Sequence, residues 1–227
     1  YYFDRGDYDE AIRHMTKVAQ LAPNEPESHR VLGVAYTNIG KFSQAEEELR
    51  RAISLQETAP ALHALGVALM YQGKDREAIP QFLRALSLNP KRYLSWMNLG
   101  ICYRRTNHAV ESGAANRKGL AEVETELAQN PRSGYARSVL GYLCARLGDR
   151  KRAESEIEQA LRLSPSDSDT RWVAAATYAA LGQSDTLLAL LEASPNAVLQ
   201  DFNRWPDAAD LRRDQRFQKL FTSHRIR

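Results

Sequence analysis

Residues 32–45 read LGVAYTNIGKFSQA, and this block decides the fold because close copies of it recur along the chain. Residues 65–78 read LGVALMYQGKDREA, and residues 140–153 read LGYLCARLGDRKRA. Each copy has a Leu-Gly pair, an aromatic or apolar residue three positions later, then a glycine and an alanine. Self-similarity of this kind at a fixed spacing is typical of repeat proteins.

The period of the repeat is close to 34 residues. A partial copy begins at Leu99, and a weaker one surrounds Tyr178. The leading glycines are spaced by 33, 34 and 41 residues, and they are Gly33, Gly66, Gly100 and Gly141. A period of this length indicates a solenoid of helical hairpins, so we expect an all-α fold.

Each repeat is expected to form two antiparallel helices joined by a short turn. In the repeat at residues 26–58 the first helix should end before Gly40, since glycine adopts the left-handed conformation that ends a helix at little cost. The second helix should cover about residues 43–55. Gly33 and Ala45 are expected to lie where the two helices cross, because a bulky side chain there would push the backbones apart.

The predicted domain organisation is a repeat array over residues 1–194 and a C-terminal helical cap over residues 195–227. The array should open with half a repeat, residues 1–23, whose missing first helix we expect to be supplied by residues before Tyr1. The full repeats are expected at about 26–58, 59–92, 93–133, 134–167 and 168–194. The cap follows because an array needs a terminal element with one apolar and one polar face.

The third full repeat is seven residues longer than its neighbours. Seven residues make about two helical turns, so the insertion lengthens a helix without rotating its apolar face. It falls between Asn107 and Asn130, where Gly113 and Gly119 weaken a helix by about 1 kcal/mol each. One long helix is the favoured interpretation, and a kinked or broken helix is the alternative.

Composition narrows the class of protein. Hydrophobic residues make up 43% of the 227 residues and charged residues 26%, which is ordinary for a soluble domain. No apolar run is long enough to cross a membrane and no signal-peptide pattern opens the chain, so a cytoplasmic location is favoured over a periplasmic one. The net charge of +3 lies in residues 201–227, which leaves no basic stripe for nucleic acid. No membrane contact is expected from this segment.

The search for catalytic chemistry is negative. The histidines are scattered without metal-ligand spacing, the glycines follow the repeat period rather than a phosphate loop, and no serine lies in a nucleophile motif. Cys102 and Cys144 fall inside expected helices, where buried free thiols are favoured over a disulfide or ligand pair. We therefore expect no enzyme activity, no metal and no cofactor.

The repeats resemble the tetratricopeptide repeat family up to about Ser194. This resemblance implies a right-handed superhelical solenoid of helix-turn-helix repeats with a groove lined by the first helix of each repeat. The family's carboxylate clamp is absent, since Arg30 alone has a suitable character among the equivalent positions Arg30, Val34, Ala64, Leu94 and Asn98. The ending LRRDQRFQKL, residues 211–220, is similar to C-terminal repeat regions of bacterial signalling proteins, either Ser/Thr kinases or winged-helix regulators. Gln215 replaces the proline usual in those tails.

The candidate peptide groove follows from the first-helix positions that this family turns inward. They carry aromatic, Met and Arg residues where a solvated face would carry Lys and Glu, as interface cores do. We expect Tyr71, Arg104, Arg105 and Tyr142 to point into one concavity, and the two arginines, which have no acid on their own helix, to face water or a ligand. The full candidate set is Arg30, Val34, Asn38, His63, Val67, Tyr71, Met97, Ile101, Arg104, Arg105, Ser138, Tyr142, Arg146 and Trp172.

The predicted function is therefore a non-catalytic protein-interaction scaffold that holds a peptide or a partner protein in this groove. Two alternatives belong to other classes. One is self-association through the open half repeat at residues 1–23, which would make a homo-oligomer. The other is a helical-repeat RNA reader, which the electrically neutral body of the chain disfavours.

Overall fold

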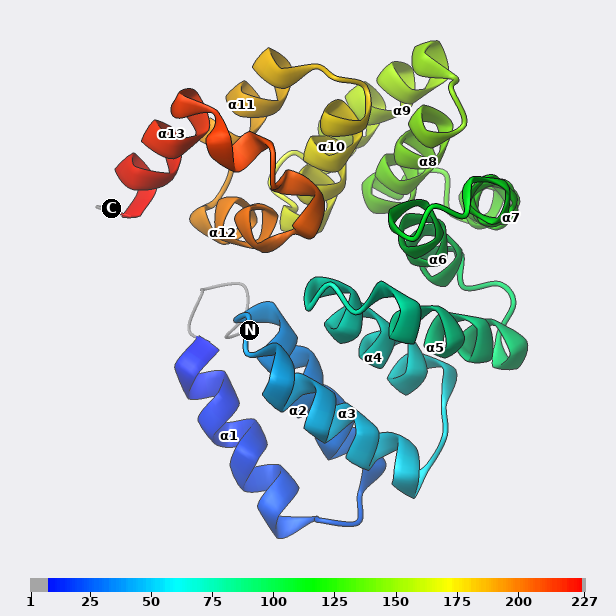
Figure 1. The fold of residues 1–227 in the computed structure, drawn as a ribbon, viewed down its shortest axis with the longest axis vertical. Coiled ribbons are helices and arrows are strands. Elements are labelled where there is room, and N and C mark those ends of the chain that lie inside the picture. The colour runs from blue at the N-terminus through cyan, green and yellow to red at the C-terminus, as the bar shows by residue number, and fades with distance from the viewer. Residues whose placement is uncertain (1–7, 226–227) are drawn as a thin grey trace. The chain divides into compact units, whose positions relative to one another are not determined.

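The structure is a computed structural model that describes residues 8–225, and every regular element in that range is a helix (Figure 1). The prediction of an all-α fold is confirmed. Residues 1–7, which hold part of the expected opening half repeat, lie outside the described residues. The chain forms two compact units, Tyr1–Ser112 and Gly113–Arg227, which we call the first and second unit. None of the helices in the described range is both long enough and apolar enough to cross a lipid bilayer.

The first unit is a stack of helical hairpins. Its helices are α1 (Tyr8–Leu21), α2 (Pro26–Asn38), α3 (Phe42–Leu55), α4 (Ala59–Tyr71), α5 (Asp75–Leu88) and α6 (Tyr93–Arg105). Helix α2 pairs with α3 and α4 pairs with α5, while α4 also contacts both α2 and α6. The three helices α2, α4 and α6, which we call the leading helices of this unit, therefore lie side by side.

The second unit contains the remaining repeats and the C-terminal helices. A single helix of 21 residues, α7 (Ala109–Gln129), starts at the end of the first unit and passes through Gly113 and Gly119 without a break. It is followed by α8 (Gly134–Arg146), α9 (Arg150–Leu163), α10 (Ser168–Ala180), α11 (Ser184–Glu192), α12 (Asn196–Arg204), the short 3-10 helices η1 (Pro206–Ala208) and η2 (Leu211–Arg213), and α13 (Gln215–Arg225). Helix α10 contacts α8, α9, α11 and α12.

Small residues let paired helices approach closely. A Cβ atom added to Gly66 of α4 would lie 2.7 Å from two ring carbons of Phe82, which is completely buried on α5. In the second unit, a Cβ on Gly141 would lie 2.9 Å from the side chain of Ile157. Only hydrogen fits at these crossings, so the glycines of the repeat are packing residues inside the helices.

Positive backbone dihedrals end the first helix of each hairpin. Gly40, Gly73, Gly148 and Gly182 have φ between 71° and 87°, a range that L side chains rarely adopt. Asn107 takes the corresponding position after α6 with φ of 64°. Asparagine is the non-glycine residue that best tolerates this conformation, which explains how the repeat without a second glycine still makes its turn.

A recurring hydrogen bond closes four of the junctions between repeats. In each case the side chain six positions after a proline donates to that proline's carbonyl oxygen. The donor–acceptor distances are 3.1 Å for His29 to Pro23, 2.8 Å for Trp96 to Pro90, 3.1 Å for Arg137 Nη2 to Pro131 and 2.8 Å for Arg171 Nη1 to Pro165. At the junction before α4 the repeat is one residue short, and Thr58 instead caps the helix by accepting the N–H of Ala61. The six-residue link thus ties each proline turn to the helix that follows it.

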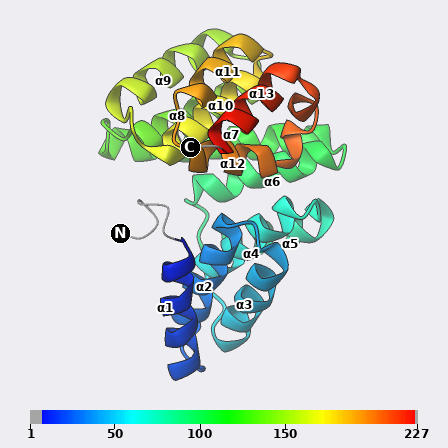
Figure 2. The same cartoon turned by 90° about the vertical axis from the view of Figure 1, so that its left-hand side faces the viewer.

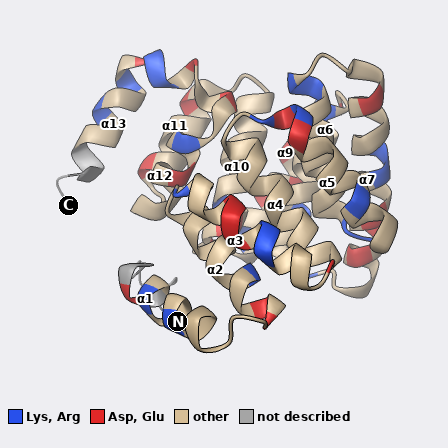
Figure 3. Ribbon diagram, turned by 60° about the horizontal axis from the view of Figure 1, so that its bottom comes forward, with Lys and Arg blue, Asp and Glu red and all other residues tan. Residues whose placement is uncertain are grey.

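Ion pairs lie on α3, the second helix of its hairpin. On α3 three glutamates, residues 46–48, are followed by Arg50 and Arg51 (Figure 3). Glu46 accepts hydrogen bonds from Arg50 on its own helix at 2.8 Å, from Gln72 at 3.0 Å and from Lys74 at 2.9 Å in the turn after α4. Burial opposes ionisation of this carboxyl, but the three donors lower the pKa of Glu46 to about 2. Glu46 therefore links two successive hairpins through its charge.

The C-terminal helices bury a set of aromatic side chains. Figure 2 shows α12 and α13 packed beside α10 and α11. Phe202 and Trp205 are completely buried, and the ring of Trp205 lies 5.2 Å from Trp172 of α10 and 5.4 Å from Phe202. Arg212 donates to the carbonyl oxygens of Asn203 and Trp205 at 2.6 and 3.1 Å. These contacts cover the end of the last hairpin.

Candidate functional site

The leading helices of the first unit carry most of the candidate residues, and α4 contacts both α2 and α6. We call this region the leading-helix face and define it by Arg30, Val34 and Asn38 on α2, by His63, Val67 and Tyr71 on α4, and by Arg92 and Arg104 at the two ends of α6. Helix α4 has no charged residue at all, yet His63, Val67 and Tyr71 keep part of their surface exposed at intervals of four residues. The sequence places Met97 and Ile101 here too, but both are buried in α6.

Arg105 differs from the expectation that it faces water or a ligand. Its side chain is 9% exposed and pairs with Asp75, whose side chain is 11% exposed, at 3.2 Å. It also donates to the carbonyl oxygen of Met70 at 3.4 Å. The acid comes from the start of α5, thirty residues earlier, so a search restricted to the arginine's own helix does not find it. Arg105 therefore links two repeats, and we no longer count it among the candidate groove residues.

The aromatic residue at the far end of α4 is held by stacking. Tyr71 lies on Phe42 with ring centroids 5.4 Å apart and nearly parallel planes. Phe42 begins α3, so the tyrosine ring is fixed against the preceding hairpin. A ring that is already ordered loses little conformational entropy when a ligand contacts it.

The opposite end of the face holds polar groups. Arg30 is fixed by both carboxylate oxygens of Glu27, at 2.7 and 2.5 Å. His63 Nδ1 lies 2.8 Å from the hydroxyl of Ser95, which joins α4 to α6, and its ring packs edge-on against Phe82. Burial, aided by the charge of Arg92, lowers the pKa of His63 to about 3. The imidazole is therefore neutral near pH 7.

The first unit is expected to lose stability in mild acid because of His63. Its pKa is near 6.5 in the unfolded chain and about 3 in the fold, so the unfolded state takes up a proton first. The stabilisation is complete above pH 6.5 and is lost as the pH falls towards 3, by about 2 kcal/mol between pH 7 and pH 5. Urea unfolding followed by circular dichroism at several pH values measures this slope.

A matched pair of variants isolates the histidine. His63→Gln should flatten the stability profile between pH 7 and pH 5, whereas His108→Gln, which changes an exposed histidine, should leave the parent slope unchanged. Equal slopes for the parent and His63→Gln would show that His63 titrates as it does in the unfolded chain.

The second unit places its candidate residues differently. Ser138 and Tyr142 of α8 are buried, with exposed fractions of 0% and 1%, and so do not line an open surface. Arg146 donates from Nε to the hydroxyl of Tyr142 at 3.0 Å, and its guanidinium lies 5.1 Å from that ring's centre. Tyr142 thus acts as a support for the half-buried Arg146.

Trp172 belongs to the C-terminal cluster rather than to a free surface. Its ring lies 5.2 Å from Trp205 and 6.2 Å from Phe202, both on the segment after α11. The spacing of residues along α10 predicts that Trp172 lies in the groove. That spacing gives no information about which later segment of the chain covers the residue. The tertiary fold brings the C-terminal helices against it.

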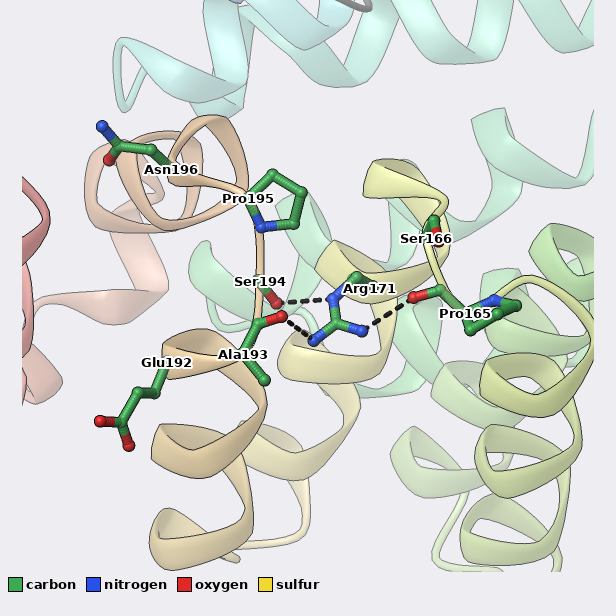
Figure 4. Close-up of a pocket in the computed structure, with 8 residues that line it drawn as sticks. All are labelled: Pro165, Ser166, Arg171, Glu192, Ala193, Ser194, Pro195 and Asn196. Atoms are coloured by element: carbon green, nitrogen blue, oxygen red, sulfur yellow. Dashed lines mark hydrogen bonds between the residues drawn. The ribbon is translucent and has the colours of Figure 1, made fainter. Parts of the chain in front are cut away.

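An open pocket of about 590 Å³ lies where α11 ends and α12 begins, and it is lined by Pro165, Ser166, Arg171, Glu192, Ala193, Ser194, Pro195 and Asn196 (Figure 4). Arg171 donates to the hydroxyl of Ser194 at 2.8 Å and to the carbonyl oxygens of Pro165, Ala193 and Leu190 at 2.8, 2.7 and 3.2 Å. Each of its three nitrogens donates to the protein. The arginine therefore ties the last hairpin together.

Within residues 8–225, no three His, Cys, Asp or Glu side chains lie close enough together to hold a metal ion. Cys102 and Cys144 are both buried free thiols, and burial raises the pKa of Cys144 to about 11. A thiol with a raised pKa is a poor nucleophile near neutral pH.

Arg92 is a residue of this face that the stripe of helix positions omits. It is the N-cap residue of α6, one position before the helix begins, and it is half-buried. The spacing rule of i, i+4 and i+8 starts inside a helix and therefore passes over it. Its position two residues after Pro90, where the other repeats carry shorter polar or acidic residues, is the sequence signal that identifies it.

Comparison with known proteins agrees with the repeat fold. Models of the tetratricopeptide repeat match residues 2–68, 59–92 and 108–168. Tetratricopeptide repeat protein 7B of Homo sapiens is 35% identical over 85 residues, which are 37% of this chain and 10% of that protein. The chain thus spans about a tenth of the length of this curated relative.

Solved structures with the same fold include the crystal structure of MamA. It is 27% identical, with a TM-score of 0.51 over 72% of this chain and 92% of that one. A chain of the crystal structure of the APC/C hetero-tetramer Cut9-Hcn1 is 17% identical, with a TM-score of 0.61 over 99% of this chain and 40% of that one. The second likeness concerns the fold alone.

Proposed function

Because the chain is a tetratricopeptide repeat protein, we propose that it is a non-catalytic scaffold that binds a peptide segment of a partner protein on the leading-helix face of its first unit. The observation that carries the proposal is helix α4. It has no charged residue, and its His63, Val67 and Tyr71 stay partly exposed. Apolar and aromatic groups on an exposed surface without Lys or Glu are typical of interface cores.

The neighbouring residues support a peptide rather than a small molecule as the ligand. Val34 on α2 continues the apolar row, while Asn38 at the end of α2 and Tyr71 on α4 offer polar groups. An extended peptide presents alternating side chains and backbone amides, so it meets both kinds of group. The surface is an open row along three helices rather than an enclosed cavity, as a peptide of several residues requires.

Selection of peptides from a displayed library tests this proposal. Enriched peptides are measured by fluorescence polarisation against the parent, Val67→Glu and Leu83→Glu. Val67 lies on the leading-helix face, whereas Leu83 is 44% exposed on the outer helix α5. A buried charge in the interface should weaken binding at least about tenfold for Val67→Glu, and Leu83→Glu should match the parent.

Two results would contradict the proposal. Equal binding by Val67→Glu and the parent, with both folded by circular dichroism, would place the peptide elsewhere. If no peptide in the library were enriched, the result would argue against peptide binding altogether.

Self-association is a second candidate, favoured by helix α1. Val18 and Leu21 of α1 are 53% and 77% exposed and lie one helical turn apart. Analytical ultracentrifugation of the parent and of Val18→Lys/Leu21→Lys tests it. A parent dimer that becomes a monomer in the double variant would support an interface on α1, and a monomeric parent would contradict it.

The ending at residues 211–220 supports one further proposal, that the chain belongs to a larger bacterial signalling or regulatory protein. Its LRRDQRFQKL sequence is the only support for this context. A kinase or winged-helix domain encoded upstream of Tyr1 would agree with it, and an unrelated upstream domain would contradict it.

A further inference from the structure

Helix α6 starts with a basic residue, whereas α2, which also lacks a side-chain cap, starts with the acidic Glu25. Thr58, Ser133 and Asp167 begin α4, α8 and α10, and each side chain accepts a backbone N–H three residues later. Helix α6 begins with Arg92, which has no acceptor atom in its side chain, and no side chain caps this helix. A basic residue, rather than a side chain that accepts a hydrogen bond, therefore stands at the partially positive N-terminus of α6.

The guanidinium of Arg92 has no partner within the described part of the chain. Its Nε is shielded from solvent without a hydrogen bond, and its terminal nitrogens make neither a hydrogen bond nor an ion pair. Arg30 and Arg105, on the same unit, are paired with Glu27 and Asp75. Arg92 is thus positioned by packing, and its terminal N–H groups remain available.

Arg92 interacts electrostatically with Arg30 and His63. Burial and the charge of Arg30 lower the pKa of Arg92, and the charge of Arg92 in turn lowers the pKa of His63. Tyr93 is the other group that acts on Arg92, and none of the three is a carboxylate. Leaving a half-buried cation without an acceptor costs free energy that a bound anion would recover.

We propose that Arg92 anchors a site for an oxyanion, a carboxylate or phosphate group carried by a peptide that lies on the leading-helix face. This inference rests on the proposed function, since the peptide brings the anion to the face. A guanidinium offers two parallel N–H groups to two oxygens of such a group. The start of α6 favours negative charge at the same place, and Arg30, already neutralised by Glu27, frames the site on α2.

Titration with small anions tests the site without requiring the natural partner. Inorganic phosphate or sodium acetate is added to ¹⁵N-labelled protein at pH 7, with ionic strength held constant by sodium chloride. The signals followed are the Arg92 Nε–H and the backbone amide of Ser95, which lies in the first turn of α6. The parent should show saturable shifts, and the apparent affinity should fall at least about tenfold in Arg92→Gln.

Two further variants complete the design. Arg76→Gln removes an exposed arginine of α5 and should leave the titration unchanged. Arg92→Lys keeps the positive charge but loses the two parallel N–H groups of the guanidinium, so it should bind anions more weakly than the parent. If Arg92→Gln does not fold, as judged by its NMR spectrum, Arg92→Lys takes its place in the comparison. Saturation by phosphate alone would assign a phosphorylated residue, and saturation by acetate alone would assign a carboxylate.

Other outcomes overturn the site. Shifts that never saturate, or that are the same in the parent and in both Arg92 variants, would show that Arg92 holds no anion. Because these titrations use no peptide, they separate the two proposals. A saturable phosphate site in a protein that selects no peptide would refute the peptide groove alone.

Discussion

Replacing Trp205 with alanine is expected to lower the free energy of unfolding of the second unit by about 3–5 kcal/mol. The indole is completely buried between Trp172 and Phe202, and its removal leaves a cavity against both rings. The last hairpin would then expose part of its apolar face, because the C-terminal helices are held there largely by this cluster. Urea unfolding followed by circular dichroism measures the loss.

Trp96→Ala is the matched control for this experiment. Trp96 is only partly buried, and its indole N–H donates to the carbonyl oxygen of Pro90 at 2.8 Å. The loss of this hydrogen bond and of a partly buried ring should cost less than the loss of the completely buried Trp205. If Trp205→Ala costs no more than Trp96→Ala, the C-terminal helices do not contribute to the stability of the last repeat.

Gly66→Ala should destabilise the first unit by about 1–3 kcal/mol, although alanine is the better helix former. The added methyl group would lie 2.7 Å from the ring of Phe82, which is buried and cannot move away. Gly113→Ala changes another glycine inside a helix, but there the new methyl group meets only the flexible side chain of Arg117 at 3.5 Å. That variant should gain about 0.5–1 kcal/mol.

The two glycine variants are compared by their urea midpoints. Opposite signs are expected because the helix propensity is the same and only the space beside the glycine differs. Stabilisation by both would mean that α4 and α5 can separate without cost, and that the spacing of small residues does not set the distance between paired helices.

The sequence predicts the helices well because their ends carry local signals. Gly40, Gly73, Gly148 and Gly182 end the first helix of four hairpins, and their conformations require no information from elsewhere in the chain. The packing role of Gly66 follows in the same way, from its position in a repeated pattern. The all-α fold rests on these local features.

The candidate site is predicted less well because its residues depend on partners in other repeats. The helix pattern predicts that Arg105 is available, but Asp75 on the preceding hairpin neutralises it. The same pattern places Trp172 in the groove, but the C-terminal helices cover it. In both cases the decisive contact joins residues about thirty positions apart, which a pattern within one helix does not contain. Arg92 is omitted for a different reason, because it precedes its helix.

The bond from a side chain to the proline six positions earlier has a consequence for how repeats are aligned. Histidine, tryptophan and arginine fill the same column at His29, Trp96, Arg137 and Arg171. In an alignment of the repeats, this position would seem free to vary, because its residue types differ. Its chemistry is constrained, since each of these residues donates an N–H to the carbonyl oxygen of the proline six positions earlier. A substitution matrix that weights shape and hydropathy would accept leucine there, whereas the turn would lose the hydrogen bond that this side chain donates.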